Sequence, residues 1–184
     1  AHKKRADFLF PVDTKNLASV ERTIMPIIDQ VIVVNCRSVF YMPLYAKMIT
    51  MFPHLVMPTR DSIEATSNKL IMRRKFRRYF PGISPKFTSA HGGTKEDVAK
   101  VKKYVGFPCV VKPASLAASR LVSICYHEEE LASTLRKTFR GLKAAYNKMG
   151  ALVEPEVIVE EFMEGAMYSI DSYVDNTGHV KHLP

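Results

Sequence analysis

The stretch from residue 106 to residue 115 limits what this chain can fold into more than any other. A Gly-Phe-Pro turn leads into Cys109–Val111, a short apolar run typical of a buried strand. Lys112 follows directly, and small residues from Ala114 to Ser119 come next. A cation on a strand beside a loop of small residues suits an anionic ligand such as phosphate, because lysine acts as a point charge there. A solvent-facing lysine on an edge strand is the alternative, since lysine is usually exposed.

The first third of the chain alternates apolar strand-like runs with amphipathic helical segments. We expect strands at 6–11, 31–34 and 54–57, helices at 15–30 and 41–52 with a break at Pro26, and a helix cap at Asp13 or Thr14. The continuous β-branched run Val31–Val34 is typical of a buried parallel strand. This order predicts the later part of a doubly wound α/β domain whose first strands lie outside the chain.

The rest of the chain has a different order, in which strands return and one long helix intervenes. We expect short helices at 62–66, 70–80 and 95–105, a long helix at 128–149 ended by Gly150, strands at 86–88, 109–112, 121–126 and 157–159, and a hairpin of 168–174 with 179–183. Apolar residues recur every three or four positions along the long helix, which predicts one face packed on a sheet. This part therefore belongs to the α+β class.

Charge and cysteine content limit the partners and the compartment. The net charge is +9, and its densest cluster is Arg73–Arg78, which we interpret as a solvated helix face. The sequence has no motif that reads nucleic acid, so a nucleic-acid partner is the least favoured function. The three cysteines are expected to be free thiols in a reducing, cytoplasmic compartment. No apolar run is long enough to span a bilayer, so no membrane partner is expected.

Four features in a fixed order resemble the ATP-grasp superfamily of ligases. They are Asn68-Lys69 before a helix, the 106–113 stretch, the loop from Ser115 to Ser119 followed by Arg120, and Val159-Glu160-Glu161-Phe162-Met163 with Gly165. The resemblance covers roughly residues 67–171. It implies a partial pre-ATP-grasp domain over 1–66, an ATP-grasp lobe with its lid over 67–158, and a hinge with the first strands of the second lobe over 159–184.

The resemblance implies roles at the phosphates of ATP. Lys69 and Lys112 resemble the two lysines that contact the nucleotide phosphates in this family. The loop 114–119 resembles the flap that closes over the phosphates, with Ser115 and Ser119 as added hydroxyl donors and Arg120 beside them. The family flap is often rich in glycine, whereas this one reads Ser-Leu-Ala-Ala-Ser, which makes it stiffer.

The resemblance also implies an adenine site at the hinge. Glu160 resembles the acid that accepts from the adenine amino group, and Glu161 with Met163 would offer backbone contacts. The family usually has an acid near Met167 for the ribose hydroxyls. Either Asp171 or a group on the substrate side replaces that acid, or nucleotide affinity is reduced. An exposed acidic turn is the alternative interpretation of Glu160 and Glu161.

The implied reaction uses ATP and Mg²⁺ to activate a small-molecule carboxylate as an acyl-phosphate, which an amine then attacks. The magnesium-binding carboxylates are expected after Pro184, with none in this chain, so we expect a fragment of a longer enzyme. A two-stranded start of the second lobe would leave one face uncovered, so a homo-oligomer or a further C-terminal segment is expected to cover it. The alternative function is a non-catalytic nucleotide-binding module, which the flap and Met167 would favour.

Overall fold

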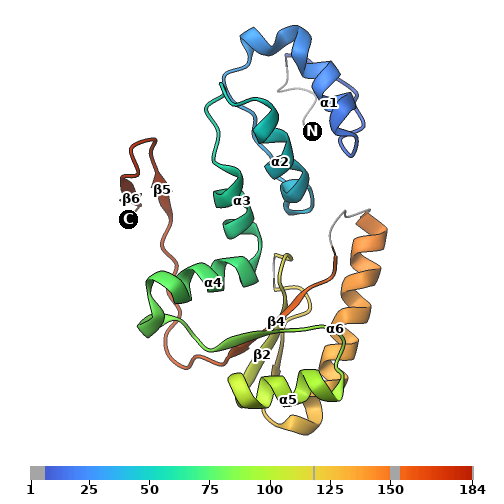
Figure 1. Ribbon diagram of the computed structural model, residues 1–184, viewed down its shortest axis with the longest axis vertical. Coiled ribbons are helices and arrows are strands. Elements are labelled where there is room, and N and C mark those ends of the chain that lie inside the picture. The colour runs from blue at the N-terminus through green and yellow to red at the C-terminus, as the bar shows by residue number, and fades with distance from the viewer. Residues whose placement is uncertain (1–6, 118, 150–153, 184) are drawn as a thin grey trace.

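The computed structural model describes residues 7–117, 119–149 and 154–183. A helical segment, a four-stranded sheet with helices on its faces, and a separate hairpin follow one another along the chain (Figure 1). Within the described residues, no helix is both long and apolar enough to span a bilayer.

The first segment is built from short helices around its own apolar core. They are α1 (Leu17–Ile24), η2 (Met25–Gln30), η3 (Val39–Tyr41), α2 (Met42–Met48), η4 (Ile49–Met51) and α3 (Arg60–Ser67). The predicted break at Pro26 is confirmed, because the α-helix ends at Ile24 and a 3₁₀-helix begins at Met25. The expected cap at Asp13 or Thr14 is wrong, since Asn16 caps α1 by accepting from the Ser19 amide.

The three strands expected at 6–11, 31–34 and 54–57 are wrong for the described residues, and Ala6 lies outside them. The last two runs do lie together, since the Val56 amide donates to the Ile32 carbonyl at 3.2 Å. Yet Ile32 is 75% exposed and Val56 is 71% exposed. A β-branched run favours a strand only where a ladder and packing on both faces support it, and one hydrogen bond provides neither. The parallel sheet expected in this segment is therefore not found in the described part of the chain.

Four of the strands expected after residue 85 are confirmed, with somewhat different bounds, and form one antiparallel sheet. They are β1 (Phe87–Ala90), β2 (Cys109–Pro113), β3 (Ser123–Cys125) and β4 (Val157–Glu161), in the order β1-β4-β2-β3. Because β4 arrives from the far end of the long helix and lies between β1 and β2, it joins segments that are distant in sequence. The mixed helix and sheet class predicted for the chain is confirmed.

The two faces of the sheet have different partners. On one face, α5 (Lys95–Tyr104) and α6 (Glu128–Met149) bury the side chains of Val111 and Val159 in the main core. On the other, α4 (Lys69–Tyr79) places Leu70 against Ile158. Side chains alternate along a strand, so Lys112 and Glu160 lie on this second face. The fold thereby places two charged side chains beside α4.

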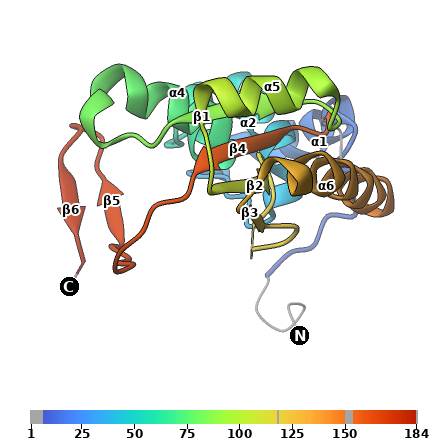
Figure 2. The same ribbon diagram turned by 90° about the horizontal axis from the view of Figure 1, so that it is seen from below.

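The C-terminal hairpin pairs β5 (Ser172–Val174) with β6 (Val180–His182) and lies apart from the main sheet (Figure 2). Its strands are exposed on both faces, with Val174 64% exposed. The predicted hairpin is confirmed, but its first strand begins at Ser172 instead of the expected residue 168. Its apolar side chains have no cover among the described residues. Gly150, the expected end of α6, lies outside those residues.

Candidate functional site

A cavity of ≈ 610 Å³ opens on the α4 side of the sheet, and we call it the lysine cavity. It brings together five of the predicted site residues: Lys69, Lys112, Ser115, Ser119 and Arg120. The other lining residues come from β2, from the loop between β2 and β3, and from the first segment, and they are Val39, Met42, Ile63, Thr66, Ser67, Val110, Pro113, Leu116, Ala117 and Val122. The sequence did not predict that Val39 and Met42 line the cavity. No spacing rule relates them to Lys112, which is 70 positions or more further along the chain.

Lys69 is fixed at the start of α4 by contacts with the loop after β2. Its amide donates to the Ala114 carbonyl at 2.9 Å, and its Nζ donates to the Leu116 carbonyl at 2.6 Å. Asn68 caps the helix through the amides of Leu70 and Ile71, which fixes the first turn. Burial, and then the nearby charge of Lys112, lower the pKa of Lys69.

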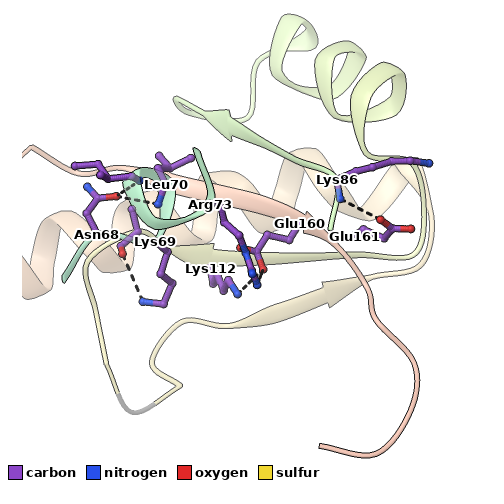
Figure 3. A network of polar contacts seen from close by, with 10 residues as sticks. Asn68, Lys69, Leu70, Arg73, Lys86, Lys112, Glu160 and Glu161 are labelled. Atoms are coloured by element: carbon purple, nitrogen blue, oxygen red, sulfur yellow. Dashed lines mark hydrogen bonds and ion pairs between the residues drawn. The ribbon is translucent and has the colours of Figure 1, made fainter. Parts of the chain in front are cut away.

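Lys112 belongs to a buried cluster of three charges (Figure 3). Its Nζ lies 2.6 Å from Glu160 Oε2, and Arg73 Nε lies 2.9 Å from Glu160 Oε1. The Glu160 side chain is only 3% exposed. Burial alone would raise the pKa of Glu160, but the hydrogen bonds and charges of Arg73 and Lys112 outweigh it and hold the pKa below its usual range. Glu160 is thus an ionised carboxylate that positions Lys112.

The role of Arg73 was missed at the sequence level. The interpretation of 73–78 as a solvated helix face holds for Arg74, Lys75, Arg77 and Arg78, which are exposed, but Arg73 is half-buried. The available signal was its spacing, because Arg73 follows Lys69 by four residues and so lies on the same helix face. Its partner Glu160 is 87 residues away, and no local pattern identifies such a partner.

The loop between β2 and β3 holds two residues in the left-handed region. Ser119 has φ 52° and Leu121 has φ 58°, which places Arg120 between two positions that usually favour glycine. Leu121 packs on the main core, and a Cβ on Gly141 of α6 would lie 2.9 Å from its Cδ2 atom. The strained loop is therefore anchored to α6 directly after Arg120.

The residues expected at adenine and ribose do not line the lysine cavity. The Glu161 carboxylate accepts from the Lys86 amide at 3.0 Å, and the Glu161 amide donates to the Lys86 carbonyl at 2.9 Å. Met163 is 59% exposed, and Asp171 is exposed further along the chain. Met167 is 97% exposed. The structure therefore gathers the residues expected at the phosphates. Of the residues expected at adenine and ribose, Glu160 is buried beside Lys112, while Met163 and Asp171 are exposed further along the chain.

The residues around the cavity do not form a magnesium site. Neither aspartate nor glutamate appears among the lining residues, and no cluster of three metal-ligating side chains occurs in the part of the chain that the structure describes. Magnesium requires oxygen ligands, so a divalent ion here would need further carboxylates.

Comparison with known proteins agrees with this architecture. Residues 105–183 match the family model described as ATP-grasp domain. A phosphoribosylamine–glycine ligase from Methanosphaera stadtmanae is 30% identical over 135 residues, covering 71% of this chain and 28% of that protein. A D-alanine–D-alanine ligase from a Thermoanaerobacter species is 38% identical over 56 residues, covering 29% and 16% respectively. The chain thus spans less than a third of the length of these curated relatives.

Solved structures share the fold at lower sequence identity. An L-amino acid ligase from Bacillus licheniformis superposes with a TM-score of 0.67 at 20% identity, over 91% of this chain and 37% of that one. Phosphoribosylamine–glycine ligase from Thermotoga maritima gives 0.59 at 21% identity, over 100% and 41%. The biotin carboxylase domain of a Hydrogenobacter thermophilus 2-oxoglutarate carboxylase, in complex with MgADP and bicarbonate, gives 0.61 at 20% identity, over 98% and 40%. On the match of residues 105–183 to the ATP-grasp domain and the similarity to phosphoribosylamine–glycine ligase, the chain belongs to the ATP-grasp superfamily.

Proposed function

We propose that this chain is the nucleotide-binding part of an ATP-dependent carboxylate–amine ligase. The observation that carries the proposal is the lysine cavity, where Lys69 and Lys112 meet the hydroxyl-bearing loop residues Ser115 and Ser119. Two separated cations can neutralise a triphosphate while its terminal phosphorus stays open to attack. The relatives are ligases and carboxylases, which favours a ligase over a non-catalytic nucleotide-binding module.

In the proposed reaction, a carboxylate oxygen attacks the terminal phosphorus of ATP, and the bond to the bridging oxygen breaks. ADP leaves, and the acyl-phosphate formed is attacked at its carbonyl carbon by an amine. The amide bond forms as inorganic phosphate departs, and the amine loses a proton to solvent or to a base. The chain contributes charge neutralisation and orientation through Lys69 and Lys112, while the loop 114–119 limits hydrolysis of the intermediate by water.

We also propose that Glu160 accepts a hydrogen bond from the adenine amino group. Both of its carboxylate oxygens already contact a cation, so the amino group would share an oxygen with Lys112 or Arg73. Backbone groups of Glu161 and Met163 are the proposed adenine contacts, and Asp171 is the proposed ribose contact. Mg²⁺ is the proposed cofactor, with its carboxylate ligands outside the described residues.

We also propose a cytoplasmic location, since Cys36, Cys109 and Cys125 are free thiols. We propose domain limits at residues 66 and 158. We also propose that a second copy of the chain or a further segment covers the hairpin.

Calorimetric titration of the chain with MgATP tests this proposal. Lys69→Ala and Lys112→Ala should each weaken binding about tenfold or more, because each removes one charge-assisted phosphate contact. Lys143→Ala is the control, since Lys143 is an exposed lysine on α6 outside the cavity. Binding that is unchanged in both cavity variants would overturn the proposed phosphate site, and so would the absence of binding in the unaltered chain.

A further inference from the structure

A second, smaller cavity of ≈ 330 Å³ adjoins the lysine cavity, and we call it the arginine cavity. The two cavities share four lining residues, Val39, Leu116, Ala117 and Arg120. The arginine cavity is completed by Arg37, Ser38 and Phe40, all from the first segment. It therefore lies between the helical segment and the loop that covers the proposed phosphate site.

Neither arginine of this cavity has a carboxylate partner among the described residues. No aspartate or glutamate lines either cavity, and the ion pairs found among residues 7–117, 119–149 and 154–183 include neither Arg37 nor Arg120. In contrast, Lys112 forms an ion pair with Glu160. A guanidinium binds carboxylate or phosphate through paired donors, so two exposed arginines that line one cavity without acidic residues favour an anionic group.

The segment that carries Arg37 is fixed on both sides. Before it, the Tyr45 hydroxyl donates to the Val34 carbonyl at 2.6 Å, and the Cys36 thiol donates to the Ser38 carbonyl at 3.5 Å. After it, Phe40 packs against the main core of the sheet. Arg37 is thus presented by a segment docked on the ATP-grasp lobe.

The backbone that carries Arg120 is fixed as well. Its neighbours Ser119 and Leu121 both have positive φ, and Leu121 packs on the main core beside Gly141. Because Arg120 lines both cavities, an anion held by it lies next to the place proposed for the ATP phosphates. A substrate carboxylate must approach from such a neighbouring position to attack the terminal phosphorus.

We propose that the arginine cavity binds a second anionic group of the acid substrate, a carboxylate or a phosphate, through Arg37 and Arg120. The substrate class is then an acid with two anionic groups, one activated by ATP and the other held by the arginines. Phe40 and Val39 supply an apolar wall for the carbon chain between them. The inference rests on the proposed function, because it takes the lysine cavity as the phosphate site.

The test is calorimetric titration at low ionic strength with three probes: succinate, 3-phosphonopropionate and butyrate. Succinate, 3-phosphonopropionate or both should bind at least about tenfold more tightly than butyrate, which has only one anionic group. Tighter binding of the phosphonate than of succinate would identify phosphate as the held group, and the reverse would identify carboxylate. Similar affinity for butyrate and both dianions, or no binding of either dianion, overturns the inference.

Variants separate this site from the nucleotide site. Arg37→Gln and Arg120→Gln should each remove most of the preference for the dianions, while Arg140→Gln, an exposed arginine on α6, should leave it unchanged. Arg37→Gln should also keep MgATP affinity within about twofold, since Arg37 does not line the lysine cavity. If both cavity variants still prefer the two dianions to butyrate, the inference is overturned while the proposed function stands. If Arg37→Gln lowers the affinity for MgATP as much as the affinity for succinate, Arg37 belongs to the nucleotide site. That result would also overturn the inference. Failure of the unaltered chain to bind MgATP counts separately against the proposed function.

Discussion

Glu160 is the residue on which the site depends most. One carboxylate, buried at 3% exposure, compensates two cations that come from β2 and α4. Such a cluster is costly to desolvate, and removing one member leaves the others buried and uncompensated. The cluster therefore positions Lys112 only while all three charges are present.

Glu160→Gln should destabilise the fold, because Arg73 and Lys112 would keep their charges without a partner. We expect a loss of about 3 kcal/mol in the free energy of unfolding, the lower end for a broken buried pair, because both cations keep some exposure. Urea unfolding at neutral pH measures it. Glu164→Gln is the control at an exposed position and should change the free energy by less than about 0.5 kcal/mol. Equal losses in the two variants would contradict the account.

The same variant has a predicted pH dependence. The folded pKa of Glu160 lies below its value in the unfolded chain, so its contribution to stability is complete above the unfolded pKa of about 4.3. That contribution is lost as the pH falls through the folded pKa. The difference in unfolding free energy between the unaltered chain and Glu160→Gln should therefore be constant above about pH 5 and shrink below about pH 4. A difference that grows on acidification would contradict the direction of the pKa shift.

At the scale of elements, the loop before α5 determines how α5 meets α6. Gly93 has φ +78°, and a Cβ built there would lie 2.7 Å from the Ala132 carbonyl oxygen of α6. Asp97 fixes the same turn by accepting from the amides of His91, Gly93 and Thr94. Two helices of the sheet's covered face thus approach closely only because residue 93 has no side chain.

Gly93→Ala should destabilise the fold by at least about 2 kcal/mol, since positive φ and a backbone collision act together. Gly92→Ala is a matched control one position earlier, where a Cβ would meet no atom within 4 Å. Chemical denaturation compares the two variants directly. If Gly92→Ala cost as much as Gly93→Ala, the close approach of α5 and α6 at this turn would be refuted.

Elements with strong local signals were predictable from the sequence. Helix α6 has the predicted bounds, Glu128–Met149, because its apolar stripe and acidic first turn are both local. Thr94 caps α5 as expected and forms a capping box with Asp97. The strand predicted at Val31–Val34 was wrong. The composition of this run matches a strand, but a strand also requires neighbouring strands, which composition does not show.

At the scale of the whole molecule, the site is assembled from segments that are far apart in the chain. The family motifs predicted Lys69, Lys112, Ser115, Ser119 and Arg120, and the structure gathers them around one cavity. The buried pair of Arg73 with Glu160 and the arginine cavity were not predictable, because both depend on how α4 and the first segment dock on the sheet. Docking is set by tertiary packing, which local periodicity does not encode.

In the proposed site, the ATP phosphates lie between Lys69 and Lys112. An acyl-phosphate derivative of ATP probes this position, because a lysine amine beside the phosphates attacks the acyl carbon, forms an amide and releases ATP. Labelled peptides are then identified by mass spectrometry, with and without excess ATP. Lys69 should be the main labelled site, since its lowered pKa leaves more free amine and Lys112 is held by Glu160.

Excess ATP should suppress this label, while any background label on Lys143, exposed on α6, should not respond. ATP-sensitive labelling at Lys69 or Lys112 is the expected result. ATP-sensitive labelling confined to lysines outside the cavity, or labelling of neither cavity lysine, would contradict it.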